Sequence, residues 1–351
     1  MIKYYTRACN FYYGSNSRNL IKRNLALPLC GDKNIAFDKI ELFKRLDNKI
    51  TSKFLSLKDI NLQNNNIKKK IKNDIKKITT KRINFNNQAV MGILNMTPDS
   101  FSDGGKYNKD NKAIKRINQM IKSGVDIVDI GGESTRPGSK VISPIREWKR
   151  IKGIIKIFKK KYPKIFLSID TRKSEIMKNA LKYKVDIIND VSGFNYDKKS
   201  IAVVKTSKVW KIIHHMQGTP KTMQKNPKYK NVLLDIYDFF ENTINNQLKG
   251  AESFNKIVLD PGIGFGKKLK HNLMLINKIS LFHSLGFPIL IGASRKKFIN
   301  EISGKLDSKE RLGGTLSSVL YALSQGVQIF RVHNVGEVKQ GILVYKRLLD
   351  Q

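Results

Sequence analysis

The chain has 351 residues, with 67 Lys and Arg against 28 Asp and Glu and a formal net charge of +39 at pH 7. Two cysteines are too few for a disulfide framework, and no apolar stretch approaches the eighteen or so residues that a membrane span needs. A disulfide-rich secreted protein and a membrane protein are therefore excluded, and we expect a cytoplasmic protein with no membrane partner.

The positive charge raises nucleic-acid binding as a function of a different class. The excess is spread along the chain, because residues 1–87 hold 20 Lys and Arg against 6 Asp and Glu, and residues 88–351 hold 47 against 22. No recognised nucleic-acid motif accompanies this charge. The chain is also dense in Asn and Ile, which an AT-rich coding sequence favours. We interpret most of the charge as solvated helix faces and expect no nucleic-acid partner.

The first part of the chain, residues 1–87, is predicted to be a basic N-terminal extension. Ala8 to Arg45 mixes aromatic and aliphatic residues, so this stretch is expected to fold against the rest. Asn48 to Arg82 is rich in Lys, Asn and Ile, which predicts a tether or an exposed helix. The first residues include no acidic one, so an organellar transit peptide is conceivable, although the aromatic content argues against it.

Eight short apolar runs follow, and each is closed by polar or glycine residues. The first run ends at Leu94 and the others are Val125–Ile130, Ile165–Ile169, Val185–Ile188, Val209–Ile213, Ile257–Leu259, Pro288–Ile291 and Val327–Phe330. Helix-length stretches with apolar residues at three- and four-residue spacing lie between them. Eight β and α units over roughly 260 residues predict that residues 88–351 form a (β/α)8 TIM barrel. An open doubly wound sheet is the alternative.

These motifs, in this order, resemble the dihydropteroate synthases of the pterin-binding family. The resemblance runs from about Ala89 to the C-terminus, and it is carried by MGILNMTPDSFSDGG, DIGGESTRPGS, SIDTRKSE, INDVSGF, HMQGTPKTMQ, LDPGIGFGK, GASRKKF and RVHNV. It implies a transferase of folate biosynthesis. The reaction joins 6-hydroxymethyl-7,8-dihydropterin diphosphate to 4-aminobenzoate and gives 7,8-dihydropteroate and diphosphate. We also expect a homodimer.

Four polar residues at strand ends suit the pterin. Its ring edge carries N–H donors and a carbonyl, so its site needs carboxylate or amide acceptors and one cation or amide donor. Asp170, Asn189 and Asp260 offer the acceptors and Lys296 the cation, and all four match pterin-pocket positions of the family. Taken alone, Asp170 could equally be a helix N-cap.

The diphosphate needs cations and a hard metal. Arg331 and His333 alternate along the last strand, so both are expected to point into the barrel, where the final loops often bind phosphate. They match the family's anion-binding residues, whereas a lone His333 would more simply be a packed histidine. Asn95 matches the position that contacts Mg²⁺ and diphosphate, and its oxygen suits a magnesium ion that keeps few protein ligands.

Two Gly-, Ser- and Thr-rich loops, 97–107 and 131–139, are predicted to close over the barrel mouth. The resemblance implies that the loops order around substrates. It assigns the 4-aminobenzoate pocket to Ser134, Thr135, Arg136, Pro137 and Phe265.

The resemblance implies catalytic roles for Asp103, Asp260 and Lys296 and no covalent nucleophile, because the carbon–oxygen bond to diphosphate can break first. Cys9 and Cys30 lie outside the predicted barrel, which excludes thiol catalysis on position.

Two positions depart from the family pattern. Asn334 stands where members usually have Asp, and we expect it still to cap the final helix. Lys297 follows Lys296 where many members have Ser, which puts the detail of the aminobenzoate pocket in doubt.

Two other functions are compatible with a pterin barrel. A methyltetrahydrofolate-binding methyltransferase shares the pterin barrel but needs no diphosphate site, so the set of Asn95, Arg331 and His333 favours the synthase. A non-catalytic pterin-binding paralogue is disfavoured by the intact loop motifs.

Overall fold

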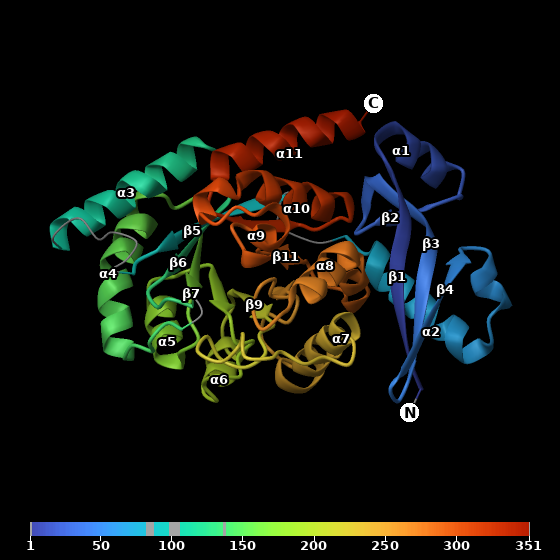
Figure 1. Cartoon of the computed structure of the whole chain (residues 1–351), viewed down its shortest axis with the longest axis horizontal. Coiled ribbons are helices and arrows are strands. Elements are labelled where there is room, and N and C mark those ends of the chain that lie inside the picture. The colour runs from blue at the N-terminus through green and yellow to red at the C-terminus, as the bar shows by residue number, and fades with distance from the viewer. Residues whose placement is uncertain (1, 82–87, 98–105, 136–137, 351) are drawn as a thin grey trace.

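The computed structural model describes residues 2–81, 88–97, 106–135 and 138–350. Figure 1 shows a small N-terminal sheet beside a larger sheet that is surrounded by helices. The larger sheet consists of β5 (Ala89–Asn95), β6 (Ile127–Gly131), β7 (Phe166–Asp170), β8 (Ile187–Asp190), β9 (Trp210–His214), β10 (Ile257–Asp260), β11 (Leu290–Ile291) and β12 (Ile329–Val332).

These eight strands are parallel and follow the order β10-β9-β8-β7-β6-β5-β12-β11. A parallel bridge between Leu259 and Ile289 joins β10 to the residue before β11, so the sheet closes into a nearly complete barrel. The predicted TIM barrel is confirmed, and the open doubly wound sheet is wrong.

The strands are buried on both faces, which explains why they are continuous apolar runs in the sequence. One set of side chains fills the barrel interior, and it comprises Ala89, Met91, Ile127, Ile187, Trp210, Ile212, Val258, Leu290 and Ile329. The alternate residues pack outward against the helices. These helices are α3 (Lys106–Lys122), α4 (Pro144–Lys161), α5 (Ser174–Lys182), α6 (Ser200–Lys205), α7 (Val232–Asn242), α8 (Leu269–Asn277), α9 (Lys297–Ser303), α10 (Leu312–Ser324) and α11 (Val335–Leu349).

The extension forms a four-stranded antiparallel sheet around the long strand β3 (Asp32–Leu46). Strand β1 (Ile2–Tyr13) pairs with β3 along nearly its whole length, and β2 (Leu27–Leu29) and β4 (Lys49–Ser56) share its other edge. The helices of this part are α1 (Gly14–Lys22), η1 (Asp59–Leu62) and α2 (Asn65–Thr79).

The stretch predicted to be a tether or an exposed helix has regular secondary structure, and its helix is partly buried. It forms β4, η1 and α2, and α2 packs its apolar stripe into the core of the extension. Ile71 and Ile78 are fully buried, and Ile67 and Ile75 pack beside them. Isoleucines at three- and four-residue spacing make the helix amphipathic, so the many lysines lie on its solvent side.

Within the described ranges, none of the helices combines the length and apolar character that a bilayer span requires.

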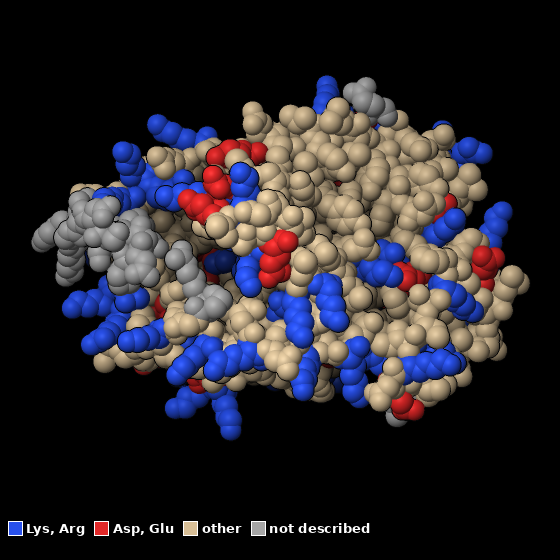
Figure 2. Space-filling view, viewed as in Figure 1, with Lys and Arg blue, Asp and Glu red and all other residues tan. Residues whose placement is uncertain are grey.

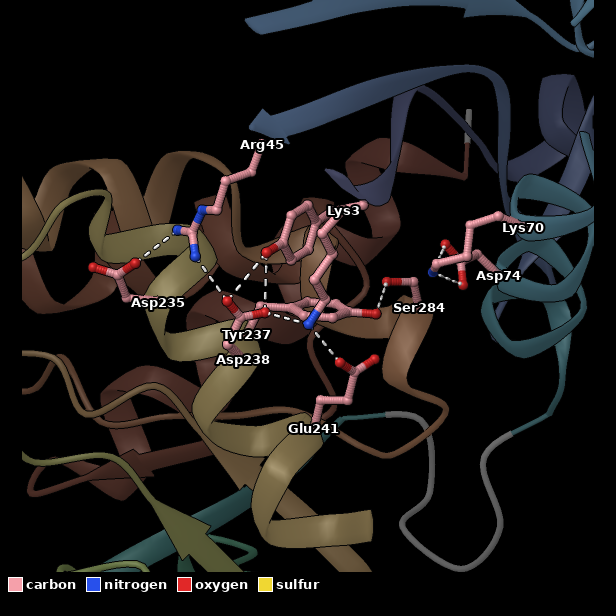
Figure 3. A network of polar contacts seen from close by, with 10 residues as sticks. Lys3, Arg45, Lys70, Asp74, Asp235, Tyr237, Asp238, Glu241 and Ser284 are labelled. Carbon is pink, nitrogen blue, oxygen red and sulfur yellow. Dashed lines mark hydrogen bonds and ion pairs between the residues drawn. The ribbon is translucent and has the colours of Figure 1, made fainter. Parts of the chain in front are cut away.

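Acidic residues on α7 hold the extension against the barrel (Figure 3). Lys3 Nζ lies 2.6 Å from Asp238 Oδ1 and 2.6 Å from Glu241 Oε2. Arg45 reaches Asp235 at 2.6 Å and Asp238 at 2.7 Å through its two terminal nitrogens. These groups are partly exposed, so each pair contributes modestly, but the geometry fixes how the extension sits on the barrel.

A more deeply buried ion pair lies beside this network. Glu41 of β3 is 1 % exposed and accepts hydrogen bonds from Arg7 at 2.8 Å and from Lys278 at 2.6 Å. Lys278 belongs to the barrel, just before η4 (Ile279–Leu285). Burial alone would raise the pKa of Glu41, but the hydrogen bonds from Lys278 and Arg7 outweigh it and lower that pKa.

Replacing Glu41→Gln should lower the free energy of unfolding by about 3 kcal/mol, because it leaves Arg7 and Lys278 side by side without their counter-charge. Urea denaturation measures the loss. Glu252→Gln is the matched control: Glu252 pairs with Lys208 at 3.4 Å, but their side chains are 46 % and 82 % exposed, so its loss should stay below about 1 kcal/mol. Equal losses in the two variants would contradict a special role for the buried pair.

Candidate active site

Five predicted residues meet around one small cavity at the carboxyl ends of the barrel strands: Asn189, Asp260, Phe265, Lys296 and Arg331. Three further residues line it, namely Val191, His214 and Gly292. The cavity is therefore built from the ends of β8, β9, β10, β11 and β12 and the loops that follow them.

The walls of this cavity present hydrogen-bond acceptors. Asn189 Oδ1 is buried and has no protein partner, while its Nδ2 donates to Asp129 at 3.2 Å. Asp260 Oδ1 accepts from the backbone N–H of Gly262 at 2.8 Å. Gly262 has φ +68°, and a Cβ there would lie 1.9 Å from the carbonyl oxygen of His215, so only glycine fits the turn that holds Asp260. An unpartnered acceptor in such a place is costly unless a ligand donates to it.

Arg331 crosses the barrel interior to two carboxylates. Its Nε lies 2.7 Å from Asp129 Oδ2 on β6, and a terminal nitrogen lies 2.8 Å from Asp170 Oδ2 on β7. Asp129 is fully buried. Burial raises the pKa of Asp170, and the neighbouring guanidinium only partly offsets this effect. Arg331 therefore points inward as predicted, and Asp170 is an ion-pair partner rather than a helix cap.

Lys296 lines the same cavity as these acceptors. Its Nζ lies 3.9 Å from the centroid of the Phe265 ring, a cation–π contact. Burial, with help from Arg331, lowers the pKa of Lys296 to about 8 although Asp260 and Asp170 favour its charge. Lys296 is therefore a desolvated donor, well placed to meet a carbonyl or a ring nitrogen.

Sequence reasoning missed His214 at the end of β9. Its Nδ1 lies 2.9 Å from the carbonyl oxygen of Val191. Burial, then the charges of Lys267 and Lys296, lowers the pKa of His214 well below its usual range, so the ring is neutral. A carbonyl only accepts, so Nδ1 carries the proton and Nε2 is an acceptor. This Nε2 lies 3.9 Å from Asp260 Oδ2, beyond hydrogen-bond range.

Phe265 is held in place by two contacts. Its ring packs edge-on against His214, with centroids 4.5 Å apart. Its carbonyl oxygen accepts from Lys267 Nζ at 2.9 Å, and the same ammonium lies 3.1 Å from His215 Nδ1. Burial lowers the pKa of Lys267 to about 7. Lys267 thus ties the loop after β9 to the loop after β10, a role that the motif GFGK did not reveal.

Asn95 ends β5, and its side-chain oxygen lies near the carboxylate of Asp170. A Cβ on Gly131 would lie 3.7 Å from Asn95 Oδ1 and 3.7 Å from Asp170 Oδ2, so both oxygens border the same residue. Among the described residues, no three His, Cys, Asp or Glu side chains form a metal-binding group. One amide oxygen near one carboxylate fits an ion such as Mg²⁺, which keeps waters and phosphate oxygens as its other ligands.

His333 lies at the rim, one residue beyond β12. Its Nδ1 is 3.0 Å from Ser294 Oγ, and its backbone N–H donates to the same oxygen at 3.2 Å. Its carbonyl oxygen accepts from Arg116 of α3. These contacts hold the imidazole of His333 in place, two residues after Arg331 in the chain.

The loop 131–139 is anchored by Glu133. Arg172 Nε and Lys173 Nζ each donate to it at 2.9 Å, and the backbone N–H of Ile142 donates at 3.1 Å. Burial would raise the pKa of Glu133, but these hydrogen bonds lower it overall.

Of the residues predicted for the aminobenzoate pocket, Phe265 lines the cavity. Ser134 and Thr135 follow Glu133 in the chain and do not line the cavity. Arg136 and Pro137 lie outside the described residues, as does Asp103 on the first loop.

The two departures from the family pattern are also placed. Lys297 is 79 % exposed and pairs with Glu301 at 3.2 Å, so it points to solvent and away from the cavity. The expected cap by Asn334 is wrong: the residue precedes α11, but its side chain makes no capping hydrogen bond. It accepts from Arg295 at 2.6 Å and donates to Glu337 at 2.8 Å, and these partners outcompete the helix N-terminus.

Comparison with known proteins places this site in a family. The family model described as pterin binding enzyme matches residues 91–333, well over half of the chain. The chain therefore belongs to the pterin-binding enzymes.

Its relatives narrow the assignment. Dihydropteroate synthase of Escherichia coli (strain K12) is 38 % identical over 268 residues, which cover 76 % of this chain and 94 % of the relative. The Yersinia pestis dihydropteroate synthase, solved with a sulfonamide drug complex, has a TM-score of 0.70 and 33 % identity, covering 76 % of this chain and 95 % of that one. The Xanthomonas albilineans enzyme, solved with 4-aminobenzoic acid, has a TM-score of 0.70 and 31 % identity, covering 75 % and 94 %. Within the family, the chain belongs with the dihydropteroate synthases, which are transferases.

Replacing Asp260→Asn should stabilise the ligand-free protein at pH 7. Burial raises the pKa of Asp260 to about 6, partly offset by the Gly262 N–H, so its carboxylate is held where a neutral group is preferred. A raised pKa contributes stability at low pH that is lost as pH rises through about 6. Asn keeps the acceptor for Gly262 without the charge.

We expect this variant to gain about 1–3 kcal/mol at pH 7 and little near pH 4. Urea denaturation of the ligand-free protein at the two pH values measures the difference. A variant less stable than the parent at pH 7 would show that the carboxylate is fully compensated by Lys296 and Arg331.

Proposed function

We propose that the cavity holds the pterin ring of 6-hydroxymethyl-7,8-dihydropterin diphosphate, and that 4-aminobenzoate enters over it, beside Phe265 and the loop 131–139. The chain then makes 7,8-dihydropteroate and diphosphate. The observation that carries the proposal is the polarity of the cavity. Its buried acceptors, Asn189 Oδ1 and Asp260 Oδ2, face one desolvated cation, Lys296, which complements a flat ring edge with N–H donors and one carbonyl.

His214 adds a third acceptor to this set. Its Nε2 is close enough to Asp260 Oδ2 for the two atoms to receive N–H groups from the same ring edge. The neutral imidazole fits a neutral ring better than an imidazolium would, because the cavity already holds Lys296 and Arg331.

The diphosphate is assigned to the neighbouring end of the cavity, where Arg331, His333 and Asn95 come from β12 and β5. Arg331 already shares its charge with Asp129 and Asp170, so a magnesium ion held in part by Asn95 would supply further positive charge to the leaving group. Asp260 and, on the first loop, Asp103 are assigned to stabilise positive charge that develops on the pterin. Lys296 is assigned to orient the ring.

The fold suits a homodimer. Large apolar side chains are exposed on neighbouring helices: Leu273 and Met274 on α8, Tyr321 on α10, and Leu343, Val344 and Leu348 on α11. Figure 2 shows few charged side chains over α10 and α11, whereas Lys and Arg are dense elsewhere on that face. A second copy would cover this area without bringing many like charges together.

The remaining assignments concern domains and location. We place the domain boundary at 87/88, between the N-terminal sheet and the barrel. A reducing compartment such as the cytoplasm suits the thiols of Cys9 and Cys30.

The activity is tested by complementation of a strain that lacks dihydropteroate synthase and by assay of the purified chain. Growth restored by the parent but not by Asp260→Ala supports the assignment. A methyltetrahydrofolate-binding barrel would fail to complement. It would also bind the pterin with the same affinity whether or not the diphosphate was attached.

Affinity for the pterin diphosphate should fall at least about 30-fold in Asp260→Asn, because a charged acceptor for a buried ring donor is lost. Asp190→Asn is the matched control, since Asp190 is likewise buried, at the end of β8, but accepts from Ser192 rather than lining the cavity. Calorimetric titration should show no comparable loss in the control.

The pH dependence gives a second check on the same pair. The parent's affinity should fall as pH drops below about 6, where Asp260 is protonated, and the Asn variant should lose that dependence. An unchanged affinity in Asp260→Asn would remove this residue from the pterin pocket.

Bond cleavage before amine attack predicts that the protein with Mg²⁺ and pterin diphosphate slowly releases diphosphate when 4-aminobenzoate is absent. The reason is that none of Asn95, Arg331 and His333 is positioned as a covalent nucleophile toward carbon. A coupled diphosphate assay measures the release. Arg331→Lys is expected to slow it at least about tenfold, because a lysine cannot offer the diphosphate the two-nitrogen contact of a guanidinium. Isolation of a pterin–protein adduct would contradict this order of events.

A further inference from the structure

A cysteine–histidine pair lies far from the cavity, where the extension meets the barrel. Cys30 occupies the turn between β2 and β3 with φ +53°, a left-handed conformation that non-glycine residues seldom adopt. Its backbone N–H donates to the carbonyl oxygen of Ile78 in the last turn of α2 at 2.8 Å. The residue is partly exposed. The turn is thus fixed by the extension while its side chain faces the barrel.

The imidazole of His283 on η4 lies against this thiol. Cys30 Sγ is 3.3 Å from His283 Nδ1, and His283 Nε2 is 2.8 Å from the carbonyl oxygen of Gln325. Because a carbonyl only accepts, Nε2 carries a proton, and in the neutral ring Nδ1 is then the acceptor for the thiol proton. A nucleophile, a base and a group that orients the base are the arrangement that activates thiols in enzymes.

Gln328 completes the surroundings of the sulfur. Its Nε2 donates to Cys30 Sγ at 3.3 Å, and its Oε1 accepts from the backbone N–H of Ile289 at 2.8 Å. The second contact fixes which end of the amide faces the thiol. A donor aimed at sulfur favours the thiolate over the thiol.

Two lysines border this part of the chain through their carbon atoms. The Cα and Cβ of Lys81 lie next to Gly31, the residue after Cys30, and the aliphatic stem of Lys77 lies next to Gly286 at the end of η4. Asp32, two residues along the chain, is the nearest acidic residue in the sequence.

We propose that Cys30 is an activated thiol that exchanges with low-molecular-weight disulfides, with His283 as its base. His283 Nδ1 takes the thiol proton, and the Cys30 sulfur attacks one sulfur of the disulfide. A new bond forms between Cys30 and that sulfur, the S–S bond of the reagent breaks, and its second half leaves as a thiolate that takes the proton back from His283. One disulfide and one thiol enter, and one mixed disulfide and one thiol leave.

The adduct would form at the seam between the extension and the barrel. The thiol's hydrogen bonds with His283 and Gln328 would be lost, and these two residues belong to the barrel. The site is independent of the pterin cavity, so its chemistry can be tested whether or not the proposed function holds.

Cys9 provides a control within the same chain. It is 7 % exposed, and burial raises its pKa to about 11. Burial of Cys9 disfavours its thiolate, whereas the hydrogen bonds around Cys30 favour its thiolate.

The test uses the full chain with Cys9→Ser, which leaves Cys30, and with Cys30→Ser, which leaves Cys9. Alkylation by iodoacetamide is followed by mass spectrometry at pH 7 and pH 9. An ordinary thiol, with a pKa near 8.5, loses roughly 25-fold in rate between pH 9 and pH 7 because only the thiolate reacts. Cys30 should lose less than about fivefold and should also form a mixed disulfide with oxidised glutathione at pH 7.

His283→Gln should restore the steep pH dependence of an ordinary thiol. If that variant does not fold, the pH ratio of Cys9→Ser alone decides the matter. A 25-fold ratio for Cys30, a rate at pH 7 no greater than that of Cys9, or equal rates in the His283→Gln variant would each overturn the proposal.

Discussion

One guanidinium, buried inside the barrel, sets the charge balance on which the site depends. Arg331 comes from the last strand and reaches two carboxylates on the second and third strands of the barrel, so it joins strands that are far apart in the chain. A buried ion pair of this kind is weak evidence for stability, because desolvation offsets most of the attraction. Its charge favours the ionised form of Asp170, although burial still raises the pKa of that carboxyl to about 7. The guanidinium and its two partners are held at fixed positions among the strand ends, which is what recognition of a polar ring requires.

The acceptors that remain unpartnered follow from this balance. Asn189 Oδ1 is left without a protein donor, while Arg331 donates to the carboxylates of Asp129 and Asp170. Such groups lower the stability of the empty protein, and a ligand that donates to them recovers that free energy on binding. The site is therefore pre-organised at the expense of stability, above an inner layer of the barrel that is largely apolar.

The sequence predicts the strands and most of the cavity because both depend on local order. An apolar run that ends in a polar residue marks the barrel mouth wherever it occurs. Two inward-facing residues, Asp129 and His214, were not predicted. Asp129 lies within an apolar run, and His214 lies beside other polar residues. Asp129 shares its parity with Ile127, and His214 shares its parity with Trp210 and Ile212, so period-two alternation from the buried strand centres would have found both.

Other features were beyond local reasoning. The stripe of Ile67, Ile71, Ile75 and Ile78 was hidden among lysines, and it could be found only by testing helical spacing inside a polar stretch. The contact of Cys30 with His283 joins residues 253 positions apart, and no pattern in either segment points to the other. Sequence patterns of this kind locate elements and their ends, whereas the pairing of distant loops is set by how the extension docks.

The charged residues of this chain fall into two groups: lysines exposed to solvent, and acidic residues such as Glu41 that are buried where the extension meets the barrel. Most lysines are on the surface and repel one another, and dissolved salt weakens that repulsion over about 10 Å at 0.1 M. Glu41, by contrast, is almost completely withdrawn from solvent, so its attraction to Arg7 and Lys278 is screened far less. Rising ionic strength therefore relieves the repulsion while leaving the strongest contact at the seam nearly intact. We therefore expect the contact between the extension and the barrel to depend little on salt concentration.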